Sequence, residues 1–280
     1  MTNKLIIENG GTKSIWVLMH GNGQMERVEQ EGMHPLLSEE EALRLWCRAF
    51  REQVKGKPDQ VFFYSTGTAV PEVNVRMAAI LADVFGVPTE RVEIAADVVA
   101  SARATCQREP GISCILGTGS NACLYDGAAV VMKAGGLGYI LGDEGSGAYM
   151  GKQMLVDYLR HQLPLDVRKL LESALQLDAA AIIQATYHKP FPNKYFASFA
   201  PFIVERREES YFRALIRRSV QDFLDTTVYS FPGHGELPVH FTGSIAWYLR
   251  EQIAEVCEEG GLRTGLFQQN PVAGLVQYHQ

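Results

Sequence analysis

The stretch that decides the fold is ISCILGTGSNACLYDGAAVVMKAGGLGYILGDEGSGAYM, residues 112–150. Glycine-bearing loops interrupt it three times, and short apolar runs lie between them. An Asp-Gly pair, Asp126 with Gly127, separates two of these runs and is a strong signal for a hairpin. We therefore expect three strands joined by hairpins, at residues 113–116, 122–125 and 128–132.

The loop Gly117-Thr118-Gly119-Ser120-Asn121 follows the first of these strands directly. Because another strand is expected after it, we interpret the loop as a tight turn that opens no helix. Its glycines expose backbone N–H groups, and Thr118 and Ser120 add hydroxyls, a combination that binds phosphate. An ordinary glycine hairpin would look the same if the loop stood alone.

Length and composition limit the class of protein. The chain has 280 residues, enough for about two domains, and it is 46% hydrophobic and 21% charged, so it can bury ordinary cores. A net charge of -6 argues against nucleic acid or an anionic membrane as a partner. No apolar run approaches the roughly twenty residues of a membrane span, and the start of the chain lacks a signal-peptide core. We expect a cytoplasmic protein that binds neither nucleic acid nor membrane, with a homodimer as a possible assembly.

The cysteines show neither a CxxC pair nor a metal-binding spacing. Most of them lie in apolar segments, so we expect reduced core residues. The five are Cys47, Cys106, Cys114, Cys123 and Cys257.

A second hairpin with similar chemistry opens the chain. Strands are expected at residues 4–7 and 15–19, and ENGGTKS at residues 8–14 joins them. The turn carries two glycines, two hydroxyls and a lysine, but it lacks the GxxxxGK[ST] pattern and opens no helix. We therefore interpret it as a phosphate-binding hairpin that is not a P-loop.

The rest of the first half alternates helices and strands. We expect a third strand at residues 25–30 and a helix that Ser38 caps, with Glu41 completing a capping box. The core stripe of this helix is expected at Ala42, Leu45, Trp46, Ala49 and Phe50. Further strands are expected at residues 61–64 and 92–95, with a helix between them that begins at Pro71 and ends at Gly86.

The second half repeats this order. After the three hairpin strands we expect a long helix at about 146–161, a strand at 239–242, a helix through Glu258 and a last helix near the C-terminus. The sequence therefore predicts an α/β fold of two ribonuclease-H-like domains. Their expected limits are 1–111 and 112–280, with a helical insert at about 165–229, and the last helix can pack back on the first domain.

Four further features carry candidate chemistry. Asp97 lies between a strand and a helix, so it can be a helix N-cap or a general base. The loop at residues 135–139 is bare enough for its backbone to approach a ligand. Asp143 and Glu144 precede a helix and can favour its N-terminus electrostatically. The turn at 241–246 runs from a strand into a helix and can pass close to an adenosine.

In this order the motifs resemble those of the N-acetylglucosamine kinase and BadF/BadG/BcrA/BcrD ATPase family, within the superfamily of sugar kinases and actin. The resemblance covers nearly the whole chain. The matching segments are ENGGTKS at 8–14, ADVVASA at 96–102, GTGSN at 117–121, GGLG at 135–138, GDEGS at 142–146 and TGS at 242–244.

The resemblance implies that ATP with Mg²⁺ lies between two actin-like ATPase domains. Glu8 would hold Mg²⁺ through water, and Asp97 would accept the proton of a sugar 6-hydroxyl as it attacks the γ-phosphorus. The residues implied for ATP are Gly10, Gly11, Thr12, Lys13, Gly117, Thr118, Gly119, Gly243 and Ser244. Those implied for the sugar are His34, Asp97, Ser120, Asn121, Gly136, Leu137, Gly138 and Asp143.

Two departures from the family pattern concern the sugar. His34 stands where the family usually carries an asparagine, and Leu137 where it carries a tryptophan. The acceptor implied first is N-acetylglucosamine. N-Acetylmuramic acid and glucosamine are the alternatives, and a protonated His34 would favour the acidic sugar.

Two other functions compete with a kinase. A BadF-type activator of a dehydratase would need thiolates for an iron–sulfur cluster, whereas Cys114 and Cys123 lie within expected strands. A nucleotide sensor that has lost its chemistry is disfavoured by Asp97 and by the intact phosphate loops.

Overall fold

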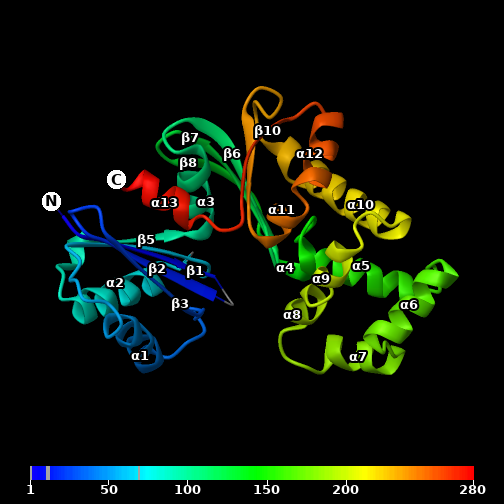
Figure 1. Cartoon of the computed structure of the whole chain (residues 1–280), viewed down its shortest axis with the longest axis horizontal. Coiled ribbons are helices and arrows are strands. Elements are labelled where there is room, and N and C mark those ends of the chain that lie inside the picture. The colour runs from blue at the N-terminus through cyan, green and yellow to red at the C-terminus, as the bar shows by residue number, and fades with distance from the viewer. Residues whose placement is uncertain (1, 11–12, 69) are drawn as a thin grey trace. The chain divides into compact units, whose positions relative to one another are not determined.

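The computed structural model describes residues 2–10, 13–68 and 70–280, and the chain divides into two compact units (Figure 1). Unit 1 comprises Met1–Gln107 with Pro271–Gln280, and unit 2 comprises Arg108–Asn270. A domain is a unit that can fold alone, so the domain limits expected from the sequence stay a prediction. Within the described ranges, no helix has both the length and the apolar character that a membrane crossing requires.

Unit 1 contains a five-stranded sheet in the order β3-β2-β1-β4-β5. Its strands are β1 (Lys4–Asn9), β2 (Lys13–Met19), β3 (Met25–Glu31), β4 (Gln60–Ser65) and β5 (Val92–Ala96). Its helices are α1 (Glu40–Arg51), α2 (Pro71–Phe85), the short η1 (Thr89–Arg91), α3 (Asp97–Cys106) and α13 (Val272–Tyr278). The first three strands pair antiparallel, and β1, β4 and β5 pair parallel.

Helices cover both faces of this sheet, with α1 and α2 on one side and α3 and α13 on the other (Figure 1). Side chains of β1 alternate accordingly: Leu5 and Ile7 join the core with α1 and α2, and Ile6 joins the core with α3 and α13. Trp16 stacks on Phe50 of α1 with ring centroids 4.6 Å apart. The C-terminal helix thus belongs to unit 1.

The prediction for the start of α1 was wrong. Glu39 is the N-cap residue, and no side chain caps the helix. The expected core stripe was also partly wrong, because Leu45 is 56% exposed. The buried side chains of α1 are Leu43, Trp46, Cys47 and Phe50. By contrast, α2 begins at Pro71 and ends at Gly86 in a left-handed conformation, as predicted.

Unit 2 contains a second five-stranded sheet in the order β10-β9-β6-β7-β8. Its strands are β6 (Pro110–Leu116), β7 (Ser120–Asp126), β8 (Val130–Gly135), β9 (Pro238–Thr242) and β10 (Arg263–Gln268). β6, β7 and β8 pair antiparallel, and β6, β9 and β10 pair parallel, so the sheet repeats the topology of unit 1. The predicted α/β fold with two ribonuclease-H-like layers is confirmed, although β10 was not expected.

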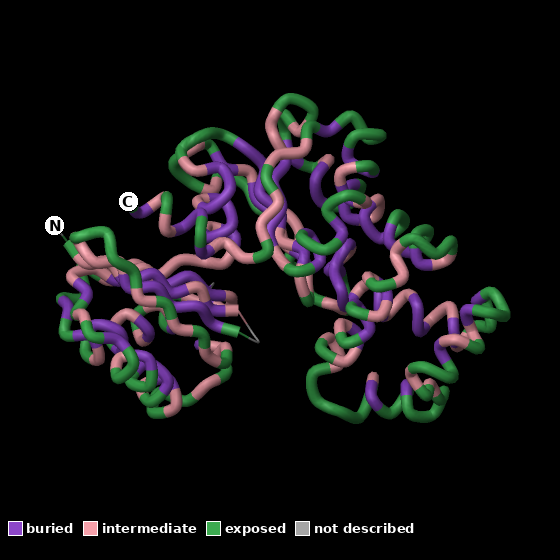
Figure 2. Tube along the Cα trace, in the orientation of Figure 1, coloured by how far each residue is buried: buried purple, intermediate pink, exposed green. Residues whose placement is uncertain are grey.

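Helices make up the rest of unit 2. They are α4 (Gly138–Leu141), α5 (Gly147–Leu159), α6 (Leu165–Leu175), α7 (Ala179–Tyr187), α8 (Pro192–Ala197), α9 (Ala200–Glu205), α10 (Ser210–Thr226), the short η2 (Val228–Ser230), α11 (Ser244–Tyr248) and α12 (Arg250–Glu259). Figure 2 shows buried residues along the central strands of each sheet and on the helices that cover them. These two cores fix the positions of the strand ends, where the candidate site residues lie.

Candidate active site

The carboxyl ends of three parallel strands meet at one edge of the unit 1 sheet. The pairing register places Asn9 of β1 beside Ser65 of β4, and Ser65 beside Ala96 of β5. Asp97 follows Ala96 directly and is the first residue of α3. Parallel topology therefore brings Asp97 to the edge at which the first hairpin leaves β1.

Glu8 and Asp97 are close enough to influence each other's charge. Burial and, to a smaller extent, the negative charge of Asp97 raise the pKa of the Glu8 carboxyl to about 7, and Lys13 opposes both effects. Lys13 therefore compensates the charge of ionised Glu8 only in part. Such a carboxyl group favours a bound cation.

Asp97 touches the start of its helix without being the N-cap residue. The N-cap position belongs to Ala96, which makes no side-chain cap. Oδ1 of Asp97 accepts a hydrogen bond from the Val98 N–H at 2.8 Å. This contact orients the carboxylate, and the role of Asp97 as a general base stays a prediction.

The His34 loop is attached to the same edge of the sheet. Nδ2 of Asn9 donates to the Met33 carbonyl at 2.7 Å, and the Met33 N–H donates back to Oδ1 of Asn9 at 3.2 Å. The His34 ring lies against Gly67, where an added Cβ would be 2.5 Å from Cε1. Burial lowers the pKa of the His34 imidazole.

Sequence reasoning identified His34 but missed Asn9 and Gly67. The available signals were an asparagine inside a glycine hairpin and the Ser-Thr-Gly-Thr turn that follows β4. Neither signal points to a partner without the fold.

The first hairpin is described in part. The Gly10 N–H donates to the Lys13 carbonyl at 2.9 Å, and the Lys13 ammonium pairs with Glu29. Gly11 and Thr12, which the resemblance assigns to ATP, lie outside the described residues.

The second hairpin packs on the start of α5. The Gly147 N–H donates to the Gly117 carbonyl at 2.9 Å, and the Ala148 N–H donates to the Thr118 carbonyl at 3.1 Å. Oγ of Ser146 caps the helix by accepting from the Tyr149 N–H at 3.1 Å. These first-turn N–H groups already have partners, so a phosphate would meet the hairpin itself, where Thr118 is exposed.

Asp143 lies directly behind this hairpin. Its Oδ1 accepts a hydrogen bond from the Ser120 N–H at 3.1 Å, and only 8% of the residue is exposed. An added Cβ on Gly119 would come within 2.9 Å of both carboxylate oxygens. Burial raises the pKa of Asp143, and the Ser120 hydrogen bond opposes this change.

Asn121 and Gly136 complete this side of the unit 2 site. The Gly136 N–H donates to the Ser120 carbonyl at 3.2 Å, and a Cβ on Gly136 would lie 3.0 Å from Oδ1 of Asn121. The prediction of a bare loop at 135–139 was wrong, because β8 runs through Gly135 and α4 begins at Gly138. Leu137 lies between them with 64% of its surface exposed.

The turn after β9 comes close to the second hairpin as well. Gly243 has φ +112°, and an added Cβ would lie 2.3 Å from the Leu116 carbonyl oxygen, directly before the hairpin. Ser244, the first residue of α11, is exposed. Unit 2 thus gathers Gly117, Asn121, Asp143 and Gly243 around one loop.

Among the described residues, no three or more His, Cys, Asp or Glu side chains gather in a way that could hold a metal. Mg²⁺ is typically held by one or two carboxylates together with substrate phosphates. The half-buried carboxyl of Glu8 fits that requirement.

All five cysteines are buried thiols. Burial raises the pKa of Cys47 and of Cys257 to about 12, whereas a metal ligand must be deprotonated.

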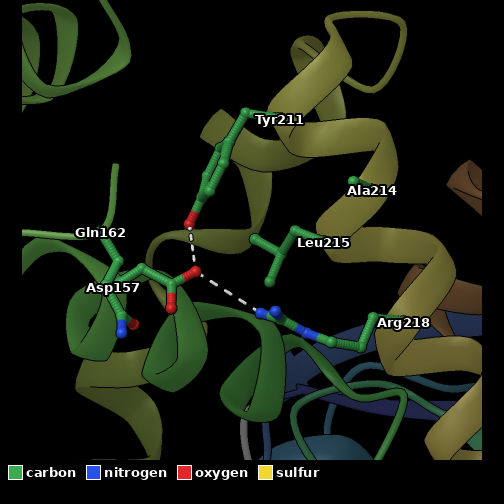
Figure 3. A pocket seen from close by; sticks show the side chains of 6 residues that line it. All are labelled: Asp157, Gln162, Tyr211, Ala214, Leu215 and Arg218. Atoms are coloured by element: carbon green, nitrogen blue, oxygen red, sulfur yellow. Dashed lines mark hydrogen bonds and ion pairs between the residues drawn. The ribbon is translucent and has the colours of Figure 1, made fainter. Parts of the chain in front are cut away.

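A cavity of about 240 Å³ lies elsewhere in unit 2, between the end of α5 and α10 (Figure 3). Within it Oη of Tyr211 donates to Oδ2 of Asp157 at 2.8 Å, and the Arg218 guanidinium lies 3.4 Å from the same oxygen. None of the predicted site residues lines it. These bonds tie α10 to α5, the helix whose first turn packs on the second hairpin.

No protein-family model matches the sequence, and neither does any curated protein. Solved structures do match. A candidate N-acetylglucosamine kinase from Porphyromonas gingivalis is 35% identical, with 98% of each chain covered and a TM-score of 0.90. A second candidate N-acetylglucosamine kinase, from Chromobacterium violaceum, is 19% identical with a TM-score of 0.72, covering 100% of this chain and 99% of that one. A ROK family glucokinase from Streptomyces griseus, solved with glucose and AMPPNP, is 14% identical with a TM-score of 0.59, covering 99% and 97%. The last two likenesses concern the fold alone.

Proposed function

The chain belongs to the N-acetylglucosamine kinase and BadF/BadG/BcrA/BcrD ATPase family, and we propose that it is an ATP-dependent sugar kinase. It would transfer the γ-phosphate of ATP to the 6-hydroxyl of an N-acetylhexosamine, with N-acetylglucosamine as the first candidate. The observation that carries this proposal is the 35% identity to the Porphyromonas gingivalis protein across 98% of both chains.

In the proposed reaction, Asp97 accepts the proton of the sugar 6-hydroxyl while that oxygen attacks the γ-phosphorus in line. A new O–P bond forms, the bond between the γ-phosphorus and the bridging oxygen breaks, and ADP leaves. The hydrogen bond from Val98 supports this role because it orients the carboxylate at the edge of the sheet.

Each unit would contribute groups for ATP. In unit 1 these are Glu8 and the hairpin that follows it. Bound Mg²⁺ would neutralise phosphate charge, and Glu8 would hold it. In unit 2 the backbone of Gly117–Gly119, the Thr118 hydroxyl and the turn at Gly243 and Ser244 would bind the nucleotide. The close approach of Gly243 to Leu116 supports this assignment, because it places both segments side by side.

Polar groups around the second hairpin would bind the sugar. Asn121 and Asp143 lie beside it, together with the backbone of Ser120, Gly136 and Gly138. His34 and Leu137 are the side chains that would set the choice among amino sugars. N-Acetylmuramic acid and glucosamine are the alternatives for the acceptor.

The test is kcat/KM with ATP for glucose, glucosamine, N-acetylglucosamine and N-acetylmuramic acid. We expect N-acetylglucosamine to lead and glucose to be much poorer, because buried polar groups aimed at an amide go unpaired when the amide is missing. N-Acetylglucosamine in last place would contradict the assignment. Protein purified without oxygen serves as a second check, since a 4Fe–4S spectrum would favour a dehydratase activator instead.

A further inference from the structure

We propose that Asn9 is a positioning residue that acts through Met33 to hold the His34 imidazole, so that Nε2–H is offered to an uncharged oxygen of the acceptor sugar. This inference deepens the proposed function and rests on it for the identity of the ligand. In this proposal, neutral His34 donates a hydrogen bond to a hydroxyl or an amide carbonyl, and it does not select a sugar by its negative charge.

The first support is the number of bonds that Asn9 makes. Its side chain is 1% exposed, and it both donates to the Met33 carbonyl and accepts from the Met33 N–H, at 2.7 and 3.2 Å. Nδ2 also donates to Oγ of Ser65 at 2.8 Å. Two bonds to the residue before His34 fix the direction of the loop, and the third ties it to the end of β4.

The second support is the contact of the His34 ring with Gly67. A Cβ on Gly67 would lie 2.5 Å from Cε1 of His34, 3.1 Å from Nδ1 and 3.2 Å from Nε2, so the Cε1 side of the ring lies against this glycine. Gly67 has φ +77°, a conformation that side-chain-bearing residues rarely adopt. Asn9 thus holds the loop, and Gly67 leaves room for the Cε1 side of the ring.

The third support is the unequal surroundings of the two ring nitrogens. Nδ1 of His34 is buried and has no hydrogen-bond partner, whereas Nε2 is not among the buried unpartnered atoms of the described residues. A proton on Nδ1 would be a buried donor without an acceptor, which is costly. The favoured neutral form therefore carries its proton on Nε2. Burial lowers the pKa of the imidazole and so favours a neutral ring, and the contact of the ring with the backbone of His34 itself opposes this change in part.

A neutral N–H donor recognises oxygen lone pairs without requiring a negative charge. With the N-acetylhexosamine of the proposed function as the acceptor, this donor fits a hydroxyl or the amide carbonyl of an uncharged sugar. This reasoning opposes the expectation that a protonated His34 selects an acidic sugar.

The experiment compares Asn9→Ala with Asn3→Ala. Asn3 lies just before the other end of β1 and makes the same kind of two-bond bridge, donating to the Lys57 carbonyl at 2.9 Å and accepting from the Gly21 N–H at 3.0 Å. We expect Asn9→Ala to raise KM for N-acetylglucosamine roughly tenfold, within the range that one misplaced polar contact costs. KM for ATP should rise far less, because the Asn9 side chain bonds Met33 and Ser65. In a His34→Ala background Asn9→Ala should add little, since coupled residues are not additive. Asn3→Ala should leave both KM values unchanged. Asn9→Ser is the milder variant if Asn9→Ala does not fold.

A second readout does not depend on catalysis. The ring nitrogen signals of His34, assigned with His34→Ala, should show an Nε2–H tautomer near neutral pH and should shift or broaden in Asn9→Ala but not in Asn3→Ala. Unchanged ring signals, or equal sugar KM values in both asparagine variants, would overturn the proposal. If the unmodified protein phosphorylates no amino sugar, the proposed function fails, and the ring spectra alone decide whether Asn9 positions His34.

Discussion

Ser120 and Asp143 are joined by a hydrogen bond of 3.1 Å from the Ser120 N–H to Oδ1 of Asp143, across 23 residues of sequence. The bond is buried, and it connects the second hairpin to the segment that enters α5. The backbone of Asp143 has φ +63°, a conformation that Asp and Asn tolerate better than most residues. One carboxylate thus supports the hairpin and is also a candidate ligand of the sugar.

Asp143→Ala should lower the free energy of unfolding by about 1–3 kcal/mol, because it leaves the Ser120 N–H buried without an acceptor. Asp143→Asn should retain most of the stability, since its amide oxygen can accept the same bond. Chemical denaturation measures both. Asp126→Ala is the control, because Asp126 also accepts from backbone N–H groups but in an exposed turn. A loss no larger than that of the control would contradict the role assigned to Asp143.

Asp97→Asn should lower kcat by roughly 10²–10⁴-fold while ATP binding persists, because the amide cannot accept the proton of the hydroxyl. The amide oxygen can still accept from the Val98 N–H, so we expect little loss of stability. Steady-state kinetics and a nucleotide titration measure the two effects. Asp83→Asn, on the surface of the same unit, is the matched control. Near-normal turnover in Asp97→Asn would leave Asp97 a role at the helix start only.

Gly243→Ala should destabilise unit 2 more than Gly261→Ala. Both glycines have positive φ, but a Cβ at 243 would lie 2.3 Å from the Leu116 carbonyl oxygen, and a Cβ at 261 would meet nothing within 4 Å. Gly261→Ala, the control, should lower the free energy of unfolding by about 1–2 kcal/mol through its left-handed backbone alone. Gly243, at φ +112° and ψ +165°, lies in a region almost exclusive to glycine, so its strain adds to the clash. Equal melting temperatures for the two variants would show that the turn moves freely away from Leu116.

His240 should make unit 2 sensitive to acid. Burial and, to a smaller extent, the charge of Arg263 lower the pKa of its imidazole to about 4, and Nδ1 accepts from the Leu266 N–H at 2.9 Å. The folded state therefore binds this proton less readily than the unfolded state, whose pKa is near 6.5. The contribution to stability is complete above about pH 6.5 and is lost as the pH falls toward 4, a change of about 3 kcal/mol.

His240→Gln tests this pH dependence, because the amide oxygen can accept from Leu266 but does not titrate. Unfolding free energies measured between pH 4 and 7 should fall less steeply in the variant. Parallel curves for the two proteins would assign the acid sensitivity to other groups.

The sequence by itself determined the features that depend only on residues adjacent in the chain. Asp-Gly and Gly-Thr-Gly segments between apolar runs favour hairpins through local geometry, and Gly86 ends α2 because glycine enters the left-handed region without strain. The same local signals, repeated in both halves, predicted the two sheets. They also supplied every candidate residue that lies in a contiguous motif.

Only the tertiary structure decided features that depend on packing between distant segments. Strand β10, RTGLFQ, has no apolar run and forms because β9 offers a parallel partner. In α1 the buried side chain is Leu43 and not Leu45, because the face of the helix that carries Leu43 packs against the side of the sheet that carries Trp16.

The candidate site shows the same division. The pairs Asn9 with Met33, Gly67 with His34, and Ser120 with Asp143 each join segments that are far apart in the chain. A hydrogen bond or a close contact depends on distances of a few tenths of an ångström, which strand pairing and helix packing set. Residue types identified the groups capable of the chemistry, whereas the cores of the two units determined which of those groups are held in contact.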